Sequence, residues 1–460
     1  MAKVFHQDIG QMQYTGYAQE LNRTLTFKDL VVYGLVAMLP IAPTQVYGTI
    51  AQASTGMTAL VYLIGILAMV FTAISYNKMS KEFPIAGSAY SYVQRGLNPH
   101  IGFVVGWMVA IDYLLVPGLL IAFSTLWLSS ILPNVPAFLL IFMFAAIISF
   151  VNIRGVTMAS WVNKLFLALQ LILIALFLGC ATVFVFKNGG GVGGFTFDPI
   201  FQSGKIDLSF IATATSIAVL GFLGFDTIST LSEETKDPTK TVGKSMVASL
   251  VLIGLMFIAQ AYMASLAHPN YSDLNPEMAY FDIIREVGGD RLYYAFIIVG
   301  VISVGIANAL AVQSAISRIL YSMGRDKLLP FSNVLSKVHP VYKTPVNAIL
   351  LTGIVSALIT WVMSIDNIVK LVNFGALTAF MMINLSVIVH FYIRKKQRGF
   401  NGFLKNVVTP LIGFSIIAFI WFGLDKMTFI VGFIWMAIGI LVGAIKSKGY
   451  KEVPPTIKEV

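Results

Sequence analysis

The sequence has little charge and almost no cysteine. Only 11% of its 460 residues are charged, whereas 57% are hydrophobic. A soluble protein could not bury so much apolar surface, so this composition excludes a soluble fold and indicates a chain that lies mainly in lipid. The single cysteine, Cys180, excludes an internal disulfide and any CxxC metal or redox motif.

Targeting and catalytic motifs are also lacking. The first 26 residues are polar, so we expect no cleavable signal peptide and expect the first spanning helix to direct insertion. No HExxH, GxSxG or Walker motif occurs at a fitting place, which argues against an enzyme and against a bound cofactor or metal. The glycine-rich stretch 189–194 has no lysine after it and no helix directly behind it, so we interpret it as a flexible loop.

Long apolar runs, in contrast, are abundant. A transmembrane helix needs about 20 mostly apolar residues. We predict twelve such spans, at 28–54, 57–78, 101–128, 134–152, 157–186, 207–232, 241–267, 290–322, 345–364, 368–393, 404–424 and 428–446. The expected fold class is therefore an all-α polytopic membrane protein.

The basic residues predict the orientation of these spans. Cytoplasmic loops of membrane proteins carry an excess of Lys and Arg. With both termini in the cytoplasm, only six of the 31 Lys and Arg fall outside: Lys187, Lys205, Arg285, Arg291, Lys370 and Lys426. The net charge of +10 is thus spread over inner loops, which argues against a nucleic-acid partner and for a cell-membrane protein. The sequence leaves open whether the protein forms a homo-oligomer.

Two spans contain breaks in their apolar helices. LPIAPTQVYG (39–48) places two prolines inside the first span, and GFLGFD (221–226) places two glycines and an aspartate inside the sixth. The spans run in opposite directions and the breaks lie at matching depths, which predicts an inverted repeat with a binding site between the breaks. The alternative is a pair of ordinary kinks filled by neighbouring helices.

This repeat predicts a division of the chain. We expect a cytoplasmic tail at 1–26, a first five-helix repeat at 27–186, an outer loop at 187–206, a second five-helix repeat at 207–393, helices eleven and twelve at 394–446 and a cytoplasmic tail at 447–460.

Four stretches resemble the amino acid–polyamine–organocation superfamily. They are FPIAGSAYSYVQR (83–95), NPHIGFVVGWMVAIDYLL (98–115), GFLGFDTISTLSEETKDP (221–238) and SRILYSMGRDKLLP (317–330). Within that superfamily the chain looks most like bacterial putrescine importers. The resemblance implies a LeuT-type 5+5 fold with discontinuous helices one and six, alternating access, and a substrate held between those two helices.

The prolines of the first break bear on the substrate. Amino-acid carriers of this superfamily usually have a glycine-rich break, whose N–H groups bind the substrate carboxylate. Here Pro40 and Pro43 each remove one N–H donor, while carbonyls and the side chains of Thr44 and Gln45 stay available for a cation. The pattern favours an amine-bearing substrate, although a carboxylate held elsewhere is the alternative.

Acidic and aromatic residues complete the predicted site. Charge at membrane depth is costly and usually functional, so Asp112 in the third span is expected to pair with an ammonium group or carry a proton. Asp226 either contacts the substrate or caps the restarted helix. Phe222 and Phe225 either cover the site, with cation–π contact to an ammonium, or pack in the core.

The expected substrate-binding residues are Ala42, Thr44, Gln45, Asp112, Gly221, Phe222, Gly224, Phe225, Asp226 and Asn308, and Asp112 and Asp226 are also candidates for proton or cation coupling. Asn308 and Asn373 could instead link helices. His390 is expected to be structural. By the resemblance, some members of the superfamily place a proton-carrying lysine where this chain has Gln170, so that device is missing here.

The sequence therefore predicts a secondary-active plasma-membrane permease. No nucleotide-binding domain is recognisable, so gradients must drive transport. The favoured substrate is a small organic cation, putrescine or a related polyamine, imported by alternating access. The alternative is an amino-acid permease of the same superfamily, working by symport or exchange on a neutral or cationic amino acid. A non-transporting scaffold has no need of the paired breaks.

Overall fold

The structure, a computed structural model, describes residues 23–84, 88–155, 160–325, 331–342 and 344–452. Most of both predicted tails, and parts of the motifs at 83–95 and 317–330, lie outside these residues. The described chain is helical, and its β-structure is limited to an isolated bridge between Leu25 and Thr235.

The helices follow the apolar runs of the sequence. In chain order they are α2 (Phe27–Met38), α3 (Pro43–Ala53), α4 (Thr58–Glu82), α5 (Ser88–Gly96), α6 (Pro99–Ile131), α7 (Ala137–Ile153), α8 (Ser160–Thr182), η1 (Val183–Lys187), α9 (Leu208–Ala218), η2 (Val219–Phe222), η3 (Phe225–Glu234), α10 (Pro238–Ala267), η4 (Tyr271–Asp273), α11 (Ala279–Gly300), η5 (Val301–Asn308), α12 (Ala309–Arg325), α13 (Ser332–Leu335), α14 (Val346–Val362), α15 (Ile365–Val387), η6 (Ile388–Arg394), α16 (Phe400–Phe403), η7 (Leu404–Val408), α17 (Thr409–Trp421) and α18 (Lys426–Lys446).

Many of these helices are long and apolar enough to cross a membrane. Among the described residues nine helical segments meet that standard, and α2 with α3 makes a tenth if the bent pair is one span. The apolar helices α7 and α14 are shorter, at 17 residues each. The chain is therefore a multi-pass membrane protein, as predicted. The count of twelve spans stays a prediction.

The predicted start of the eighth span coincides with a break inside α11. Gly289 interrupts α11 with a φ of 71°, a left-handed conformation that glycine adopts without strain. The span after this break therefore begins at the predicted residue 290, and a helical segment that starts at Ala279 precedes it. Helix α11 contacts α3 and α8.

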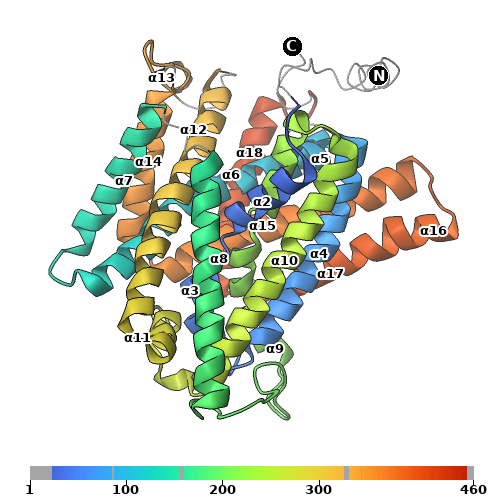
Figure 1. The fold of residues 1–460 in the computed structure, drawn as a ribbon. Coiled ribbons are helices and arrows are strands. Elements are labelled where there is room, and N and C mark those ends of the chain that lie inside the picture. Colours follow the sequence, from blue (N-terminus) through green and yellow to red (C-terminus); the bar gives the residue numbers. More distant parts are fainter. Residues whose placement is uncertain (1–22, 85–87, 156–159, 326–330, 343, 453–460) are drawn as a thin grey trace.

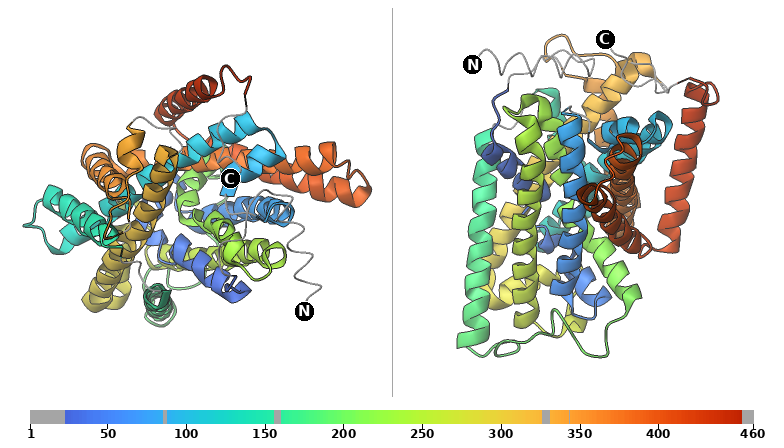
Figure 2. Two further views of the ribbon diagram at one scale, coloured as in Figure 1. Left: turned by 90° about the horizontal axis from the view of Figure 1, so that it is seen from above. Right: turned by 90° about the vertical axis from the view of Figure 1, so that its right-hand side faces the viewer.

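The ribbon places the helices around a central group. Helices α4 and α10 run side by side, and α6 packs against α15 and α14 (Figure 1). Figure 1 also places α5 and α13 at one end of the molecule and the connection 188–207 at the opposite end. We call these ends the α5 face and the α9 face. In Figure 2, α18 stands at the edge of the molecule.

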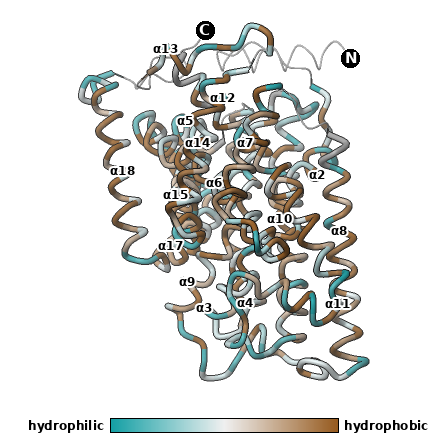
Figure 3. The backbone as a smooth tube through the Cα atoms, turned by 90° about the vertical axis from the view of Figure 1, so that its left-hand side faces the viewer, coloured by the Kyte–Doolittle hydropathy of each residue, from teal (hydrophilic) through white to brown (hydrophobic). Residues whose placement is uncertain are grey.

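Hydropathy along the chain agrees with a membrane location. The long helices are mostly hydrophobic along their length, and hydrophilic residues are concentrated in the connections at the two ends (Figure 3). Large apolar side chains are exposed on the outer helices, for example Ile354, Phe422 and Leu441. Exposed apolar side chains on such helices are expected to face lipid.

Two tryptophans attach the peripheral helix α18 to α6. The indole rings of Trp107 and Trp435 stack with their centroids 4.8 Å apart. Each indole N–H donates to the backbone carbonyl of the other residue, at 3.1 Å in both directions. This reciprocal pair satisfies both indole N–H groups, a requirement that is strict where no water is available.

Candidate functional site

The first predicted break is confirmed. Helices α2 and α3 are separated by four residues and bent by 58° relative to one another. Leu39 ends α2 with a φ of 56°, an unusual conformation for a residue with a side chain. Pro43 then occupies the first turn of α3, where its missing N–H costs no hydrogen bond.

The second predicted break is confirmed as well. The α9–η2 segment ends at Phe222, Leu223 is extended, and Gly224 has a φ of 107° before η3 begins at Phe225. A Cβ on Gly224 would lie 3.0 Å from the carbonyl oxygen of Ala37 in α2. Glycine is therefore needed both for the backbone conformation and for the close approach of the two broken spans.

The two breaks lie against each other. Helix α2 packs on η3, and α3 packs on α9, so the halves of one span meet the opposite halves of the other. A Cβ built on Gly221 would lie 3.5 Å from the Cβ of Ala42. The structure thus brings together two segments that the sequence predicted to share a site.

Gly224, rather than Asp226, takes the N-cap position of the restarted helix η3. Asp226 lies in the first turn instead. Thr227 Oγ1 donates to the carbonyl oxygen of Gly224, at 2.5 Å, and ties the restarted helix to the break. Because glycine alone fits the left-handed position, the cap falls two residues before the aspartate.

The backbone of the first break is more fully satisfied than the sequence suggested. The N–H groups of Ala42, Thr44 and Gln45 donate to the carbonyls of Leu39, Ile41 and Ala42, at 2.8 to 2.9 Å. Thr44 Oγ1 also donates to the Ile41 carbonyl, at 2.7 Å. Buried polar groups need partners, so the backbone of the break offers few free donors for a carboxylate and also fewer free carbonyls than expected. The buried side-chain amide Gln45 Nε2, in contrast, has no hydrogen-bond partner among the described residues.

Gln260 and Tyr280 support this break and were missed from the sequence. Gln260 Nε2 donates to the carbonyl oxygen of Pro40, at 3.0 Å, and Tyr280 Oη donates to Gln260 Oε1, at 3.3 Å. The Tyr280 ring makes an edge contact with Tyr47 of α3. The sequence signal that could have identified this interaction is the amide of Gln260 inside a mostly apolar span. Such amides usually form hydrogen bonds to a neighbouring helix.

Asp112 and Asp226 are brought into one electrostatic environment. Asp112 lies on α6 and Asp226 on η3, and their side chains interact through their charges. Tyr113 interacts with both carboxylates and with Tyr33 of α2. Two acids at membrane depth form a region suited to a cation or a proton.

Phe222 and Phe225 lie on either side of the second break in separate aromatic clusters. Both side chains are fully buried. Phe222 contacts Tyr62 and Phe257, with ring centroids 6.4 and 5.3 Å away. Phe225 contacts Tyr76 and Phe380, with centroids 5.5 and 5.3 Å away. These contacts hold both rings firmly in place, and a covering role for either ring stays a prediction.

The remaining predicted polar residues take several positions. Asn373 is fully buried and its amide donates to the carbonyl of Ser216 in α9, at 2.6 Å, so it links helices next to the second break.

Gln170 is buried, and its Oε1 has no hydrogen-bond partner among the described residues. Asn308 is half-buried at the end of the π-helix η5. His390 bonds to Glu82 and packs on Phe83, as expected for a structural residue.

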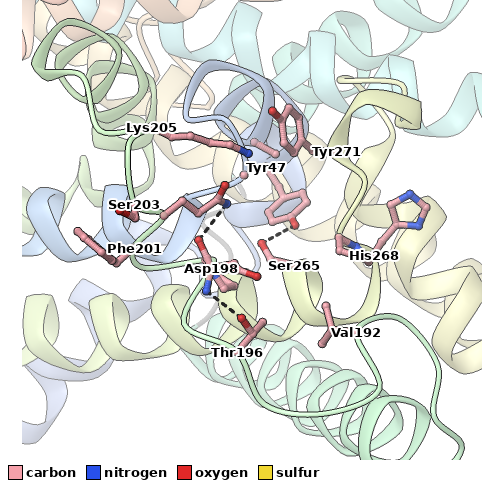
Figure 4. Close-up of a pocket in the computed structure, with 15 residues that line it drawn as sticks. Tyr47, Val192, Thr196, Asp198, Phe201, Ser203, Lys205, Ser265, His268 and Tyr271 are labelled. Carbon is pink, nitrogen blue, oxygen red and sulfur yellow. Dashed lines mark hydrogen bonds between the residues drawn. The ribbon is translucent and has the colours of Figure 1, made fainter.

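A cavity of about 460 Å³ opens beyond the break, near the α9 face (Figure 4). Tyr47 and Ser265 line it, and their hydroxyls are 3.0 Å apart. Asp198, Lys205, His268 and Tyr271 also border it. Pro40, Gln260, Tyr280 and Tyr47 therefore form a continuous set of contacts from the break to this cavity.

Exposure differs on the two sides of the breaks. From Pro43 to Ala51, α3 is buried except at Thr49, which is half-buried. On the other side, Asp112, Gly224 and Asp226 are half-buried and Tyr33 is 39% exposed. The breaks are thus more tightly covered toward the α9 face than toward the α5 face.

Comparison with known proteins identifies the relatives of this chain. The family described as "Amino acid permease" matches residues 30–454. The low-affinity putrescine importer PlaP of Escherichia coli (strain K12) is 32% identical over 443 residues, covering 96% of this chain and 97% of the importer. In Bacillus subtilis (strain 168), a methylthioribose transporter is 29% identical, over 94% of this chain and 95% of its own length, and the branched-chain amino acid permease BcaP is 26% identical, over 95% and 96%.

Proposed function

The chain belongs to the amino acid permease family, and from this premise we propose that it imports a small organic cation, most favourably putrescine or a related diamine, by alternating access. Its relatives are transporters and not enzymes. The observation that carries the proposal is the pair of interacting acids, Asp112 and Asp226, next to the two breaks.

Charge balance supports a diamine. Putrescine carries two ammonium groups at neutral pH, and two carboxylates in one site can offset both charges. An α-amino acid would bring its own carboxylate, which needs donors. The backbone of the break provides few, because Pro40 and Pro43 have no N–H and the N–H groups of Ala42, Thr44 and Gln45 already donate to backbone carbonyls.

The proposed transport cycle uses the broken spans. We place the substrate between α2–α3 and α9–η3 and assign twelve spans to a LeuT-type 5+5 arrangement with two additional helices. Both termini then lie in the cytoplasm, and the α5 face is the cytoplasmic face. The half-buried acids support access from that face in this conformation, and the contacts of Tyr47 with Tyr280 and Ser265 support closure toward the other.

The membrane potential can drive the uptake of such a substrate. Moving a positive charge inward is favoured by about 2.3 kcal/mol per charge per 100 mV. Gln170 carries no charge at the position where a coupling lysine was considered. Asp112 and Asp226 are the proposed carriers of any coupled proton or cation.

Uptake into proteoliposomes tests the substrate directly. We expect saturable uptake of labelled putrescine that is competed by other diamines and is stimulated by an inside-negative potential. The second candidate function, amino-acid transport, is favoured by the similarity to the branched-chain amino acid permease BcaP. Competition by leucine or lysine with no effect of diamines would select it and reject the diamine proposal.

A further inference from the structure

A second cavity, of about 510 Å³, lies away from the broken helices. It is formed where the C-terminal end of α4 meets η6, α16 and η7, and α16 lies at the right of Figure 1. Its lining residues are Lys78, Lys81, Glu82, Phe391, Gln397, Gly399, Asn401, Gly402, Lys405 and Asn406.

Three lysines line this cavity and form no ion pair with the acids that the structure describes. Lys81 and Lys405 are both close enough to Lys78 for their charges to repel it. Lys78 Nζ is held by the Lys405 carbonyl and by Asn406 Oδ1, which are neutral acceptors. Within the described residues, no carboxylate forms an ion pair with any of the three lysines.

The acid that lines the cavity is already engaged. Glu82 Oε1 accepts from Lys395 Nζ and lies 3.2 Å from His390 Nε2. The ring of Phe391 lies between the basic groups, with the ammonium groups of Lys78 and Lys395 each 5.9 Å from its centroid. Gathering like charges without an anion is unfavourable, so the arrangement calls for a negatively charged ligand.

An apolar surface adjoins the basic cavity. Phe400 is 79% exposed, and Phe403 and Leu404 are also exposed. In the chain they are direct neighbours of the cavity residues Asn401, Gly402 and Lys405. A soluble anion would use only the lysines, whereas an anionic lipid would use the lysines for its headgroup and the apolar side chains for its acyl chains.

We propose that this cavity binds the phosphate-bearing headgroup of an anionic phospholipid, with Lys78, Lys81 and Lys405 around the phosphate and Phe400, Phe403 and Leu404 beside the acyl chains. Basic cavities between spanning helices suit such headgroups on the side of the membrane where anionic lipids are concentrated. The positive-inside pattern places this end of α4 on that side. The site is independent of the transported substrate.

Binding of short-chain phospholipids to the purified full-length protein tests the proposal. Dioctanoyl phosphatidylglycerol, dioctanoyl phosphatidylcholine and inorganic phosphate are titrated separately, with native mass spectrometry to count bound lipid. The double variant Lys81→Gln with Lys405→Gln removes two exposed charges and leaves the more buried Lys78 in place. Lys240→Gln with Lys244→Gln removes two exposed charges from α10, outside this cavity, and is the matched control.

We expect saturable binding of phosphatidylglycerol and little binding of phosphatidylcholine. The cavity variant should weaken phosphatidylglycerol binding about 30-fold, as expected for the loss of two lysine contacts with an anionic lipid. The control variant should bind like the unmodified protein, and Lys81→Arg with Lys405→Arg should retain binding. Equal binding of the two lipids, equal weakening in both Gln variants, or tight binding of inorganic phosphate alone would overturn a lipid site.

Discussion

Asp112 and Asp226 come from different halves of the chain and yet interact through their charges in the folded protein. Asp112 is carried by the unbroken helix α6, and Asp226 by the first turn after the second break. The position of Asp226 depends on Gly224, since the restarted helix could not approach α2 as closely with a side chain at that position. The second break therefore sets the position of Asp226 and, with it, the geometry of the acidic pair.

Neutralising Asp112 should reduce transport strongly. The change Asp112→Asn keeps the shape of the side chain but removes the charge expected to face an ammonium group. Losing one partner of a buried charge pair costs about 2 kcal/mol or more, so uptake efficiency should fall about 30-fold or more. Labelled putrescine uptake, normalised to the amount of protein in the membrane, measures this.

The control for Asp112 is the same substitution at an exposed acid. Asp273→Asn, in the connection after α10, should leave uptake unchanged. If saturable uptake were the same in Asp112→Asn as in the unmodified protein, Asp112 would not belong to the substrate site.

Replacing Gln260 should destabilise the first break. Gln260→Leu leaves the Pro40 carbonyl and the Tyr280 hydroxyl without the bonds that Gln260 makes. A buried polar group without its partner costs about 1–3 kcal/mol, so the thermal midpoint in detergent should fall and uptake should fall with it. Gln52→Leu, which removes only a long bond of 3.4 Å from an exposed side chain of α3 to the Leu274 carbonyl, should change neither. An unaltered midpoint in Gln260→Leu would show that the carbonyl finds another partner.

The glycine of the second break offers a test that separates strain from contact. Gly224→Ala places a side chain in a left-handed conformation, at a cost of about 1–2 kcal/mol, and also against Ala37. Gly204→Ala imposes a similar conformation, with a φ of 74°, but meets no atom within 4 Å. We expect the drop in thermal midpoint and in uptake to be larger for Gly224→Ala. Equal effects would mean that the approach to α2 is not limiting.

An ion pair at the start of α18 should make stability depend on pH. Partial burial opposes ionisation of Asp425, but hydrogen bonds from Lys370 and the Thr428 N–H, together with the Lys370 charge, outweigh it and hold the pKa below its ordinary value of 3.8. The stabilisation is therefore fully present above about pH 4 and is lost as the pH falls through the folded-state pKa. The thermal midpoint of Asp425→Asn should lie slightly below that of the unmodified protein at pH 7, by the equivalent of about 0.5 kcal/mol for a half-exposed pair.

This difference between the two proteins should shrink as the pH is lowered through the folded-state pKa of Asp425, because the carboxyl is then protonated in the folded chain as well as in the unfolded chain. Lys451→Gln, a charge change away from this pair, is the control and should not alter the pH profile. A difference that persists at low pH would assign the effect to the helix N-cap rather than to the ion pair.

The sequence predicted the parts of the site that depend on local chemistry. Pro40 and Pro43 remove hydrogen-bond donors wherever they stand in a helix, and Gly224 allows a backbone conformation that other residues resist. Both breaks could therefore be located without a structure. Which residue takes the N-cap position could not be located in this way, because the choice between Gly224 and Asp226 depended on how closely α2 approached.

Partners that satisfy buried groups were harder to predict. Gln260 bonds to a carbonyl that lies 220 positions earlier in the chain, and nothing in the local sequence specifies that pairing. The same holds for Asn373 and the Ser216 carbonyl. Such pairings follow from the packing of helices, which brings each polar group within reach of the few others available in a dry interior.

By itself, the sequence determined that this protein lies in a membrane, is built from helices and breaks two of them, since hydropathy and the conformational limits of proline and glycine act over a few neighbouring residues. The tertiary structure alone decided that Asp112 and Asp226 lie near enough for their charges to interact, that Gln260 satisfies the Pro40 carbonyl, and that Lys78, Lys81 and Lys405 line one cavity. Those relationships join distant segments, and only the packing of whole helices sets the distances on which charge and hydrogen bonding depend.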